Sequence, residues 1–162
     1  MIFFTLGTEN YPFSRLIEVA EKLAVLRPDE EIFVQIGNHP EPPRGCRWER
    51  FLPFEKFSDC IAHARLVVSH AGAGTILTCA VHGRIPIVLK REWLRGEHID
   101  DHQSQLARRM DELGHIVLTE DPEQLLEEIL RRESSSTELR AAAEVPELAR
   151  SLARYLAGLD AR

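Results

Sequence analysis

Short apolar runs alternate along the chain with stretches in which apolar residues recur at helical spacing. The apolar runs predict strands at residues 2–6, 32–36, 66–69, 85–89 and 116–118, and a further short strand is predicted at 47–51. Helical spacing predicts helices at residues 14–26, 54–64, 75–82, 100–113 and 122–131. Continuous apolar runs of this length are typical of strands that are buried on both faces of a parallel sheet.

Turn and capping residues mark the ends of these segments. Ser14 is a candidate N-cap for the first helix, and Pro28 lies just beyond its end. Gly83 and Gly114 follow two later helices, and Pro122 occupies the first turn of another. The regular alternation of strand and helix with short connections predicts an α/β fold, a Rossmann-like open parallel sheet with helices on both faces.

The chain of 162 residues is long enough to bury the core of one domain. We expect this domain at residues 1–132, a serine-rich linker at 133–137 and an amphipathic helix at 138–162. The apolar stripe of the terminal helix consists of Leu148, Leu152, Tyr155, Leu156 and Leu159. Such a stripe fits two roles, folding back on its own domain or docking on a partner subunit.

Charge and cysteine content exclude several classes of protein. The net charge of −6 offers no basic field to a nucleic acid, so no nucleic-acid partner is expected. The cysteines form no C-x-x-C pair, which argues against a disulfide framework or a cysteine zinc cluster and favours a reducing compartment. The start of the chain lacks the basic region of a signal peptide, and no apolar run reaches the roughly 18 residues that span a bilayer. We therefore expect a cytoplasmic protein that lies at a membrane only through a partner.

The strongest local pattern is a glycine-containing loop between a predicted strand and a helix. The strand at 66–69 runs directly into His70-Ala71-Gly72-Ala73-Gly74-Thr75. Ligands of open α/β sheets bind beyond the carboxyl ends of the strands, and a helix N-terminus presents free N–H groups to an anion. The loop therefore indicates a phosphate site, although a tight turn in any α/β protein can hold two glycines. It is neither a Walker loop nor a G-x-G-x-x-G motif, which disfavours an NTPase or a dehydrogenase.

A second polar cluster lies beyond the strand at 85–89. Its sequence is Glu97-His98-Ile99-Asp100-Asp101-His102-Gln103. Carboxylate, imidazole and amide groups can bond to vicinal hydroxyls, so a sugar site is one interpretation. Two other interpretations stay open. The two histidines, one helical turn apart, could bind a metal ion, or the segment could be a solvated helix start that Asp100 or Asp101 caps. Since no third metal ligand is found nearby, no metal site is predicted.

Three basic residues lie between the two clusters. They are Lys90, Arg91 and Arg95. Their charges suit the neutralisation of a diphosphate, because charge-assisted hydrogen bonds to phosphate are strong. The alternative is a mobile basic loop that faces water and has no ligand.

The two motifs, in this order, resemble the C-terminal domain of family 28 glycosyltransferases in its free-standing, small-subunit form. The matching segments are residues 3–8, 66–75 and 97–103, within a resemblance that covers about residues 1–131. This form includes the small subunit of the two-component UDP-GlcNAc transferase of dolichol-linked oligosaccharide assembly, and bacterial small subunits of polysaccharide glucuronosyl- and galactosyltransferases. The resemblance implies the donor-binding half of a GT-B enzyme, with a separate, membrane-anchored subunit that binds the acceptor.

The resemblance also implies roles for individual residues. Main-chain groups at 51–52 would read the uracil ring, the amides at 72–75 would hold the diphosphate, residues 101–103 would face the donor sugar, and residues 7–8 would line the cleft shared with the partner. The donor is a substrate, and no cofactor is expected. The predicted donor site comprises Gly7, Thr8, Phe51, Leu52, His70, Ala71, Gly72, Ala73, Gly74, Thr75, Thr78, Arg91, Asp101, His102 and Gln103.

One position departs from the family pattern. The family often places a glutamate four residues after the second glycine of the loop, where it binds both ribose hydroxyls, and here this residue is Thr78. A threonine can make one such bond but not a bidentate one. The departure leaves the identity of the nucleotide open, and it allows a subunit that has lost donor binding.

Transfer with inversion needs a base for the acceptor hydroxyl and dipoles or charge for the departing diphosphate. His70 is the candidate base if it faces the cleft; otherwise it is a structural hydrogen bonder and the base belongs to the partner. We expect a UDP-sugar-dependent hexosyltransferase subunit that acts, with its partner, on a polyprenyl-(di)phosphate-linked acceptor in polysaccharide or glycolipid synthesis. The alternative is a non-catalytic subunit that binds nucleotide sugars or activates a partner transferase. An epimerase of related fold would need a second domain, and self-association of the chain stays open.

Overall fold

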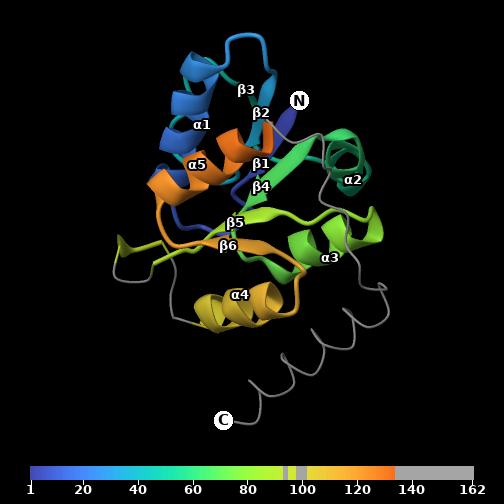
Figure 1. Cartoon of the computed structure of the whole chain (residues 1–162). Coiled ribbons are helices and arrows are strands. Elements are labelled where there is room, and N and C mark those ends of the chain that lie inside the picture. Colours follow the sequence, from blue (N-terminus) through green and yellow to red (C-terminus); the bar gives the residue numbers. More distant parts are fainter. Residues whose placement is uncertain (93–94, 98–101, 134–162) are drawn as a thin grey trace.

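The structure is a computed structural model that describes residues 1–92, 95–97 and 102–133, with residues 102–104 and 133 described by their backbone alone. Strands and helices alternate along these residues (Figure 1). The strands are β1 (Ile2–Thr5), β2 (Ile32–Gln35), β3 (Arg47–Glu49), β4 (Leu66–Ser69), β5 (Ile87–Leu89) and β6 (Val117–Thr119). The helices are α1 (Ser14–Leu26), α2 (Phe54–His63), α3 (Ala73–Val81), α4 (His102–Glu112) and α5 (Pro122–Glu133).

The strands form one parallel sheet in the order β3-β2-β1-β4-β5-β6. β1 lies between β2 and β4, so that Phe4 is paired with Val34 on one side and with Val68 on the other. The chain builds the sheet outward from β1 first in one direction and then in the other. The strand order therefore reverses between β1 and β4, and open α/β sheets bind their ligands at such a switch point.

Helices cover both faces of the sheet (Figure 1). On one face, Leu16 of α1 and Leu125 of α5 share a core with Phe4. On the other face, Phe3 packs in a cluster with side chains of α2 and α3, and Leu106 of α4 packs with α3 and β5. The predicted α/β fold with an open parallel sheet and helices on both faces is confirmed.

Burial of the strands follows the apolar runs closely. β1, β2, β4 and β5 are buried along their whole length. β3 is an edge strand with exposed Arg47 and Trp48, and it ends two residues before the predicted boundary, at Glu49. β5 begins at Ile87, two residues later than predicted, because Pro86 has no N–H to donate to a neighbouring strand.

The cap of one helix and the start of another differ from the prediction. α1 covers the predicted residues, but its N-cap is Phe13 and not Ser14, and no side chain caps it. Phe13 is fully buried and its carbonyl oxygen accepts from the N–H of Leu16, so burial of an aromatic ring fixes this helix start. α3 begins at Ala73, two residues earlier than predicted, which places the start of the helix inside the glycine loop.

The end of the described chain lies in α5, which continues to Glu133, the first residue of the predicted linker. The remainder of that linker and the predicted helix at 138–162 lie outside the described residues. Within the part of the chain that the structure describes, no helix combines the length and the apolar character needed to cross a membrane.

Candidate functional site

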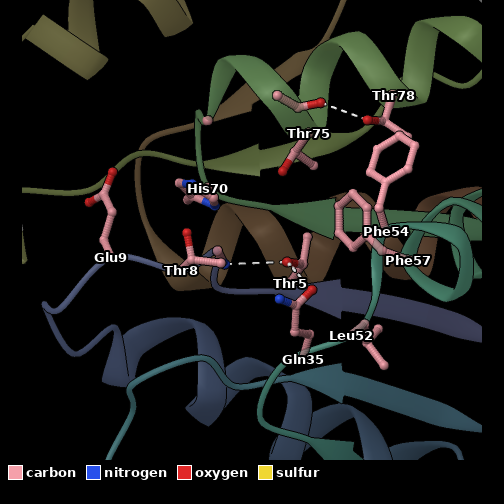
Figure 2. A pocket seen from close by; sticks show the side chains of 13 residues that line it. Thr5, Thr8, Glu9, Gln35, Leu52, Phe54, Phe57, His70, Thr75 and Thr78 are labelled. Carbon is pink, nitrogen blue, oxygen red and sulfur yellow. Dashed lines mark hydrogen bonds between the residues drawn. The ribbon is translucent and has the colours of Figure 1, made fainter.

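A cavity of about 370 Å³ opens at the carboxyl ends of β1, β2 and β4, beside the start of α3 (Figure 2). This is the switch point of the sheet, where the fold predicts a ligand. Residues from both halves of the sheet line it: Thr5, Gly7, Thr8, Glu9, Gln35, Leu52, Phe54, Phe57, His70, Gly72, Gly74, Thr75 and Thr78.

The floor of the cavity is formed by the last residues of β1 and β2. Thr5 and Gln35 are paired in the sheet and both are buried. Thr5 Oγ1 donates to Gln35 Oε1 at 3.3 Å and accepts from the N–H of Gly7 at 3.3 Å. The turns that follow the two strands press together, since a Cβ at Gly37 would collide with the carbonyl oxygen of Gly7. Both glycines have positive φ, +77° at Gly7 and +55° at Gly37, which other residues rarely adopt.

The glycine loop presents the open end of α3 to the cavity. Gly72 is the N-cap of this helix, and the N–H of Ile76 donates to its carbonyl oxygen at 3.0 Å. The amides of residues 73–75 therefore precede the first intrahelical hydrogen bond, in the turn where a helix attracts an anion. At Gly74 an added Cβ would meet nothing within 4 Å, so the main chain is directly accessible there.

The imidazole of His70 explains the other two glycines. His70 is buried, with 5% of its surface exposed, and it lines the cavity. A Cβ at Gly7 would lie 2.7 Å from its Nε2, and a Cβ at Gly72 would lie 2.9 Å from its Cε1. The missing side chain of Gly72 therefore leaves room for the His70 ring, and Gly74 is the glycine of the loop at which the space of a side chain stays open.

The cavity has an aromatic side and an acidic side. Leu52, Phe54 and Phe57 gather on one side, and Glu9 lies on the opposite side (Figure 2). Phe54 is 73% exposed although it belongs to a cavity wall. A large apolar ring that is left in water beside a cavity is a ready stacking surface for a flat ligand group.

Thr78 lies on α3 at the aromatic side, where it lines the cavity. Its hydroxyl donates to the carbonyl oxygen of Gly74, one turn earlier, at 2.8 Å (Figure 2). Only 8% of the residue is exposed. The one proton of the hydroxyl is thus used inside the helix, and its oxygen faces the cavity only as a neutral acceptor.

Several predicted site residues do not line the cavity in the part of the chain that the structure describes. Phe51 is about half exposed outside it. Ala71 is buried and Ala73 is packed against the same apolar cluster between α3 and α4. Asp101 lies outside the described residues, and His102 and Gln103 are described only as the first residues of α4.

Arg91 is buried and bonded to main-chain oxygens of three segments. It donates to Leu6 O at 2.8 Å, to Glu97 O at 2.7 Å and to Tyr11 O at 3.2 Å. Its guanidinium also lies over the ring of Phe13 at 4.5 Å. Burial lowers the pKa of Arg91 from its ordinary value, and the neighbouring carboxylates oppose this change. In this structure Arg91 ties the loop after β5 to the loop after β1, beside the cavity and not in its lining.

The other two basic residues of this segment, Lys90 and Arg95, are paired with acidic side chains. Lys90 Nζ lies 2.7 Å from Glu120, and Arg95 Nε lies 2.9 Å from Glu92. Arg15 of α1 makes a buried pair, donating through Nε to Glu97 Oε1 at 2.8 Å. The hydrogen bond that Arg15 donates to Glu97 raises the pKa of Arg15 above its ordinary value, against the effect of burial. These pairs hold the segment that leads into residues 98–103.

No group of three or more histidine, cysteine, aspartate or glutamate side chains suited to a metal ion occurs among the described residues. The predicted absence of a metal site stays a prediction, because the segment at 98–101 lies outside them.

The cavity also contains residues that the sequence did not single out. Thr5 and Gln35 are polar residues that end buried apolar strands, and this was the signal that could have revealed them. Glu9, Phe54 and Phe57 gave no such signal, because each lies in a turn or on a helix and meets the others only through the fold.

Comparison with protein families gives a match over nearly the whole chain. Residues 1–154 match the model of the glycosyltransferase family 28 C-terminal domain. The predicted resemblance to this domain is confirmed.

Two curated relatives carry the name UDP-N-acetylglucosamine transferase subunit ALG13. The protein from Eremothecium gossypii is 47% identical over 53 residues, which are 33% of this chain and 24% of that protein. The protein from Mus musculus is 27% identical over 126 residues, which are 70% of this chain and 10% of that protein. The chain thus spans at most about a quarter of the length of these relatives.

Solved structures share the fold at low identity. The glycosyltransferase of kitacinnamycin superposes with a TM-score of 0.61 at 20% identity, over 97% of this chain and 39% of that one. SnogD from Streptomyces nogalater gives 0.59 at 20% identity, over 96% and 39%. MurG from Acinetobacter baumannii gives 0.56 at 19% identity, over 82% and 40%. In each case this fold corresponds to less than half of a longer chain.

Proposed function

This chain belongs to the family of glycosyltransferase family 28 C-terminal domains, and we propose from this membership that it is the donor-binding subunit of a glycosyltransferase. The donor is a UDP-sugar. A membrane-anchored partner subunit supplies the acceptor site, and the hexosyl group passes to a polyprenyl-(di)phosphate-linked acceptor in polysaccharide or glycolipid synthesis. The name of the curated relatives, a UDP-N-acetylglucosamine transferase subunit, supports a nucleotide-sugar donor and a second subunit.

The observation that carries the proposal is the open start of α3 at the rim of the cavity. The amides of residues 73–75 lie before the first intrahelical bond, and nothing within 4 Å covers the position of a Cβ at Gly74. A diphosphate seated there gains hydrogen bonds from the main chain and the positive end of the helix dipole.

The two sides of the cavity bind different parts of the donor. The base, a flat and weakly polar group, stacks on the side of Leu52, Phe54 and Phe57. The hexose extends from the diphosphate toward the side of Thr8 and Glu9. Asp101, His102 and Gln103 stay candidate ligands of the hexose.

Transfer requires two contributions from the protein. The amides at the start of α3 stabilise the negative charge that develops on the departing UDP. A general base accepts the proton of the acceptor hydroxyl, and His70 is the candidate from this chain because its ring lines the cavity.

A second candidate function is a subunit that binds nucleotide sugars without catalysing transfer. The observation in its favour is the burial of His70, whose ring is enclosed between Gly7 and Gly72 and has 5% of its surface exposed. In this case the partner subunit supplies the base.

Calorimetric titration with UDP and UDP-sugars tests donor binding. The wild type should bind, and Gly74→Val should not, because the valine enters open space at the phosphate position without meeting other side chains. Val81→Ala, at the far end of the same helix and 59% exposed, is the matched control and should bind like the wild type. Failure of the wild type to bind any uridine nucleotide, alone or with its partner, would contradict the proposal.

With donor binding shown, transfer by the co-expressed partner complex separates the two candidates. Loss of transfer in His70→Asn with unchanged UDP affinity supports His70 as the base. Full transfer by that variant assigns the base to another residue.

A further inference from the structure

The nucleoside end of the cavity can be located from the arrangement of its walls. Phe54 and Phe57 belong to α2, and α2 lies against α3, where Ser58 Oγ is 2.7 Å from Nε2 of His82. The start of α3 faces the same cavity through Gly74 and Thr75. A nucleoside diphosphate with its phosphates at the helix start and its base on the aromatic side therefore lays its pentose along the first two turns of α3.

The side chains of α3 that line this path are Thr75 and Thr78. Each is more than nine-tenths buried, at 7% and 8% exposure. The hydroxyl of Thr78 donates its one proton to the carbonyl oxygen of Gly74, at 2.8 Å. It can offer the pentose a neutral oxygen but no donor.

Among the described residues, the carboxylate in the cavity lining belongs to Glu9, which does not lie beside Thr78. Glu9 lies across the cavity from Phe54, Phe57 and Thr78 (Figure 2). A pentose hydroxyl beside Thr78 therefore finds no charged acceptor among the described side chains. A neutral hydrogen bond changes an affinity by roughly twofold to tenfold, whereas one to a charged group changes it by roughly tenfold to a hundredfold.

We propose that the site does not read the 2′-hydroxyl of the nucleotide, so that it takes nucleoside diphosphates, and the sugars they carry, on ribose or on 2′-deoxyribose alike. This inference rests on the proposed function of the same cavity and defines its substrate class more narrowly. The geometry behind it is the hydroxyl of Thr78, which donates to the carbonyl oxygen of Gly74, on the same side of the cavity as the aromatic rings on which the base stacks.

Titration of the full chain with UDP and with 2′-deoxy-UDP measures the discrimination directly. The two dissociation constants should agree within about twofold, because even a weak neutral hydrogen bond to the 2′-hydroxyl would change the affinity by about that much. A preference for UDP of more than about twofold would overturn the inference while leaving donor binding in place. Binding of neither nucleotide would contradict the proposed function itself, and the inference with it.

Two variants of Thr78 sharpen the test. Thr78→Val keeps the shape and removes the hydroxyl, so the ratio of the two dissociation constants should stay unchanged; a ratio that falls in this variant would show that the hydroxyl reads the ribose. Thr78→Glu adds a carboxylate to the same wall and should create a preference for UDP of about tenfold or more, because the hydrogen bond then involves a charge. If the glutamate variant does not fold, as judged by circular dichroism, the wild-type and valine ratios still decide the inference.

Discussion

Gly72 leaves the space that the imidazole of His70 occupies. A Cβ at position 72 would lie 2.9 Å from Cε1 of that ring, closer than real side chains approach one another. The ring is held from the other side by Gly7, which comes from a different strand end. The start of α3 and the turn after β1 are thereby fixed to each other through one histidine, and the cavity lies beside this contact.

This contact makes Gly72→Ala destabilising. The backbone of Gly72 has φ of −73°, which alanine adopts freely, so the cost comes from overlap with His70 and not from backbone strain. We expect a loss of about 1–3 kcal/mol in the free energy of unfolding, as for other overpacked sites. Urea denaturation measures it. In the double variant with His70→Ala the alanine at 72 should cost almost nothing, and equal costs in both backgrounds would contradict the contact.

Replacement of Arg91 by methionine should also destabilise the fold. The substitution leaves the carbonyl oxygens of Leu6, Tyr11 and Glu97 without the donor that bonds them. Unsatisfied buried groups cost about 1–3 kcal/mol each, so a total loss of at least about 2 kcal/mol is expected in urea denaturation. Arg95→Met is the matched control: Arg95 is exposed and pairs with Glu92, and its loss should cost less than about 0.5 kcal/mol.

Phe54 should contribute to nucleotide affinity and little to stability. Its ring is 73% exposed yet lines the cavity, so alanine removes a stacking surface without opening a hole in the core. Stacking of a base on an aromatic side chain contributes about 1–3 kcal/mol, and we expect the dissociation constant for UDP to rise by roughly fivefold to a hundredfold. Val25→Ala, 81% exposed on α1 and outside the cavity lining, should leave it unchanged. An unaltered affinity in Phe54→Ala would place the base elsewhere.

Cys79 should make the fold sensitive to alkaline pH. Burial raises the pKa of its thiol to about 12, from the value of 9.0 expected when the chain unfolds. The folded state therefore keeps a proton that the unfolded state loses above pH 9, so stability is full below that pH and declines as the pH rises toward 12. Between pH 8 and pH 10 this group should remove on the order of 1 kcal/mol from the free energy of unfolding.

Urea denaturation at the two pH values, under reducing conditions, checks this expectation. Cys79→Ala lowers stability at both pH values because it leaves a cavity, but its stability should change less between them than that of the wild type. Cys60→Ala, at a partly exposed position, should retain most of the wild-type pH dependence. An equal change in the wild type and in Cys79→Ala would show that the thiol of Cys79 is not its source.

The layers of the fold could be predicted from local sequence patterns. The apolar runs predicted β1, β2 and β4, and the helical spacing predicted α1. These patterns are local, because the apolar residues of each strand and helix show which of its sides is buried. The position of the cavity could be predicted as well, since the residues at the carboxyl ends of parallel strands meet at one edge. The motifs in residues 3–8 and 66–75 pointed to the family of the chain, which periodicity alone does not supply.

Which residues meet at that edge, and with which partners, depends on contacts between segments that are far apart in the chain. Arg15 and Glu97 are 82 positions apart, and Arg91 bonds to Leu6 across 85 positions, so no local pattern announces either contact. The sequence therefore predicted Arg91 as a phosphate ligand, whereas the fold uses it to join two loops. A hydroxyl such as that of Thr78 has two sets of partners of similar strength, its own helix and a ligand, and the packing around it selects one. Residue type fixes the chemistry that a position can perform, and distance in the folded chain fixes the partner with which it performs it.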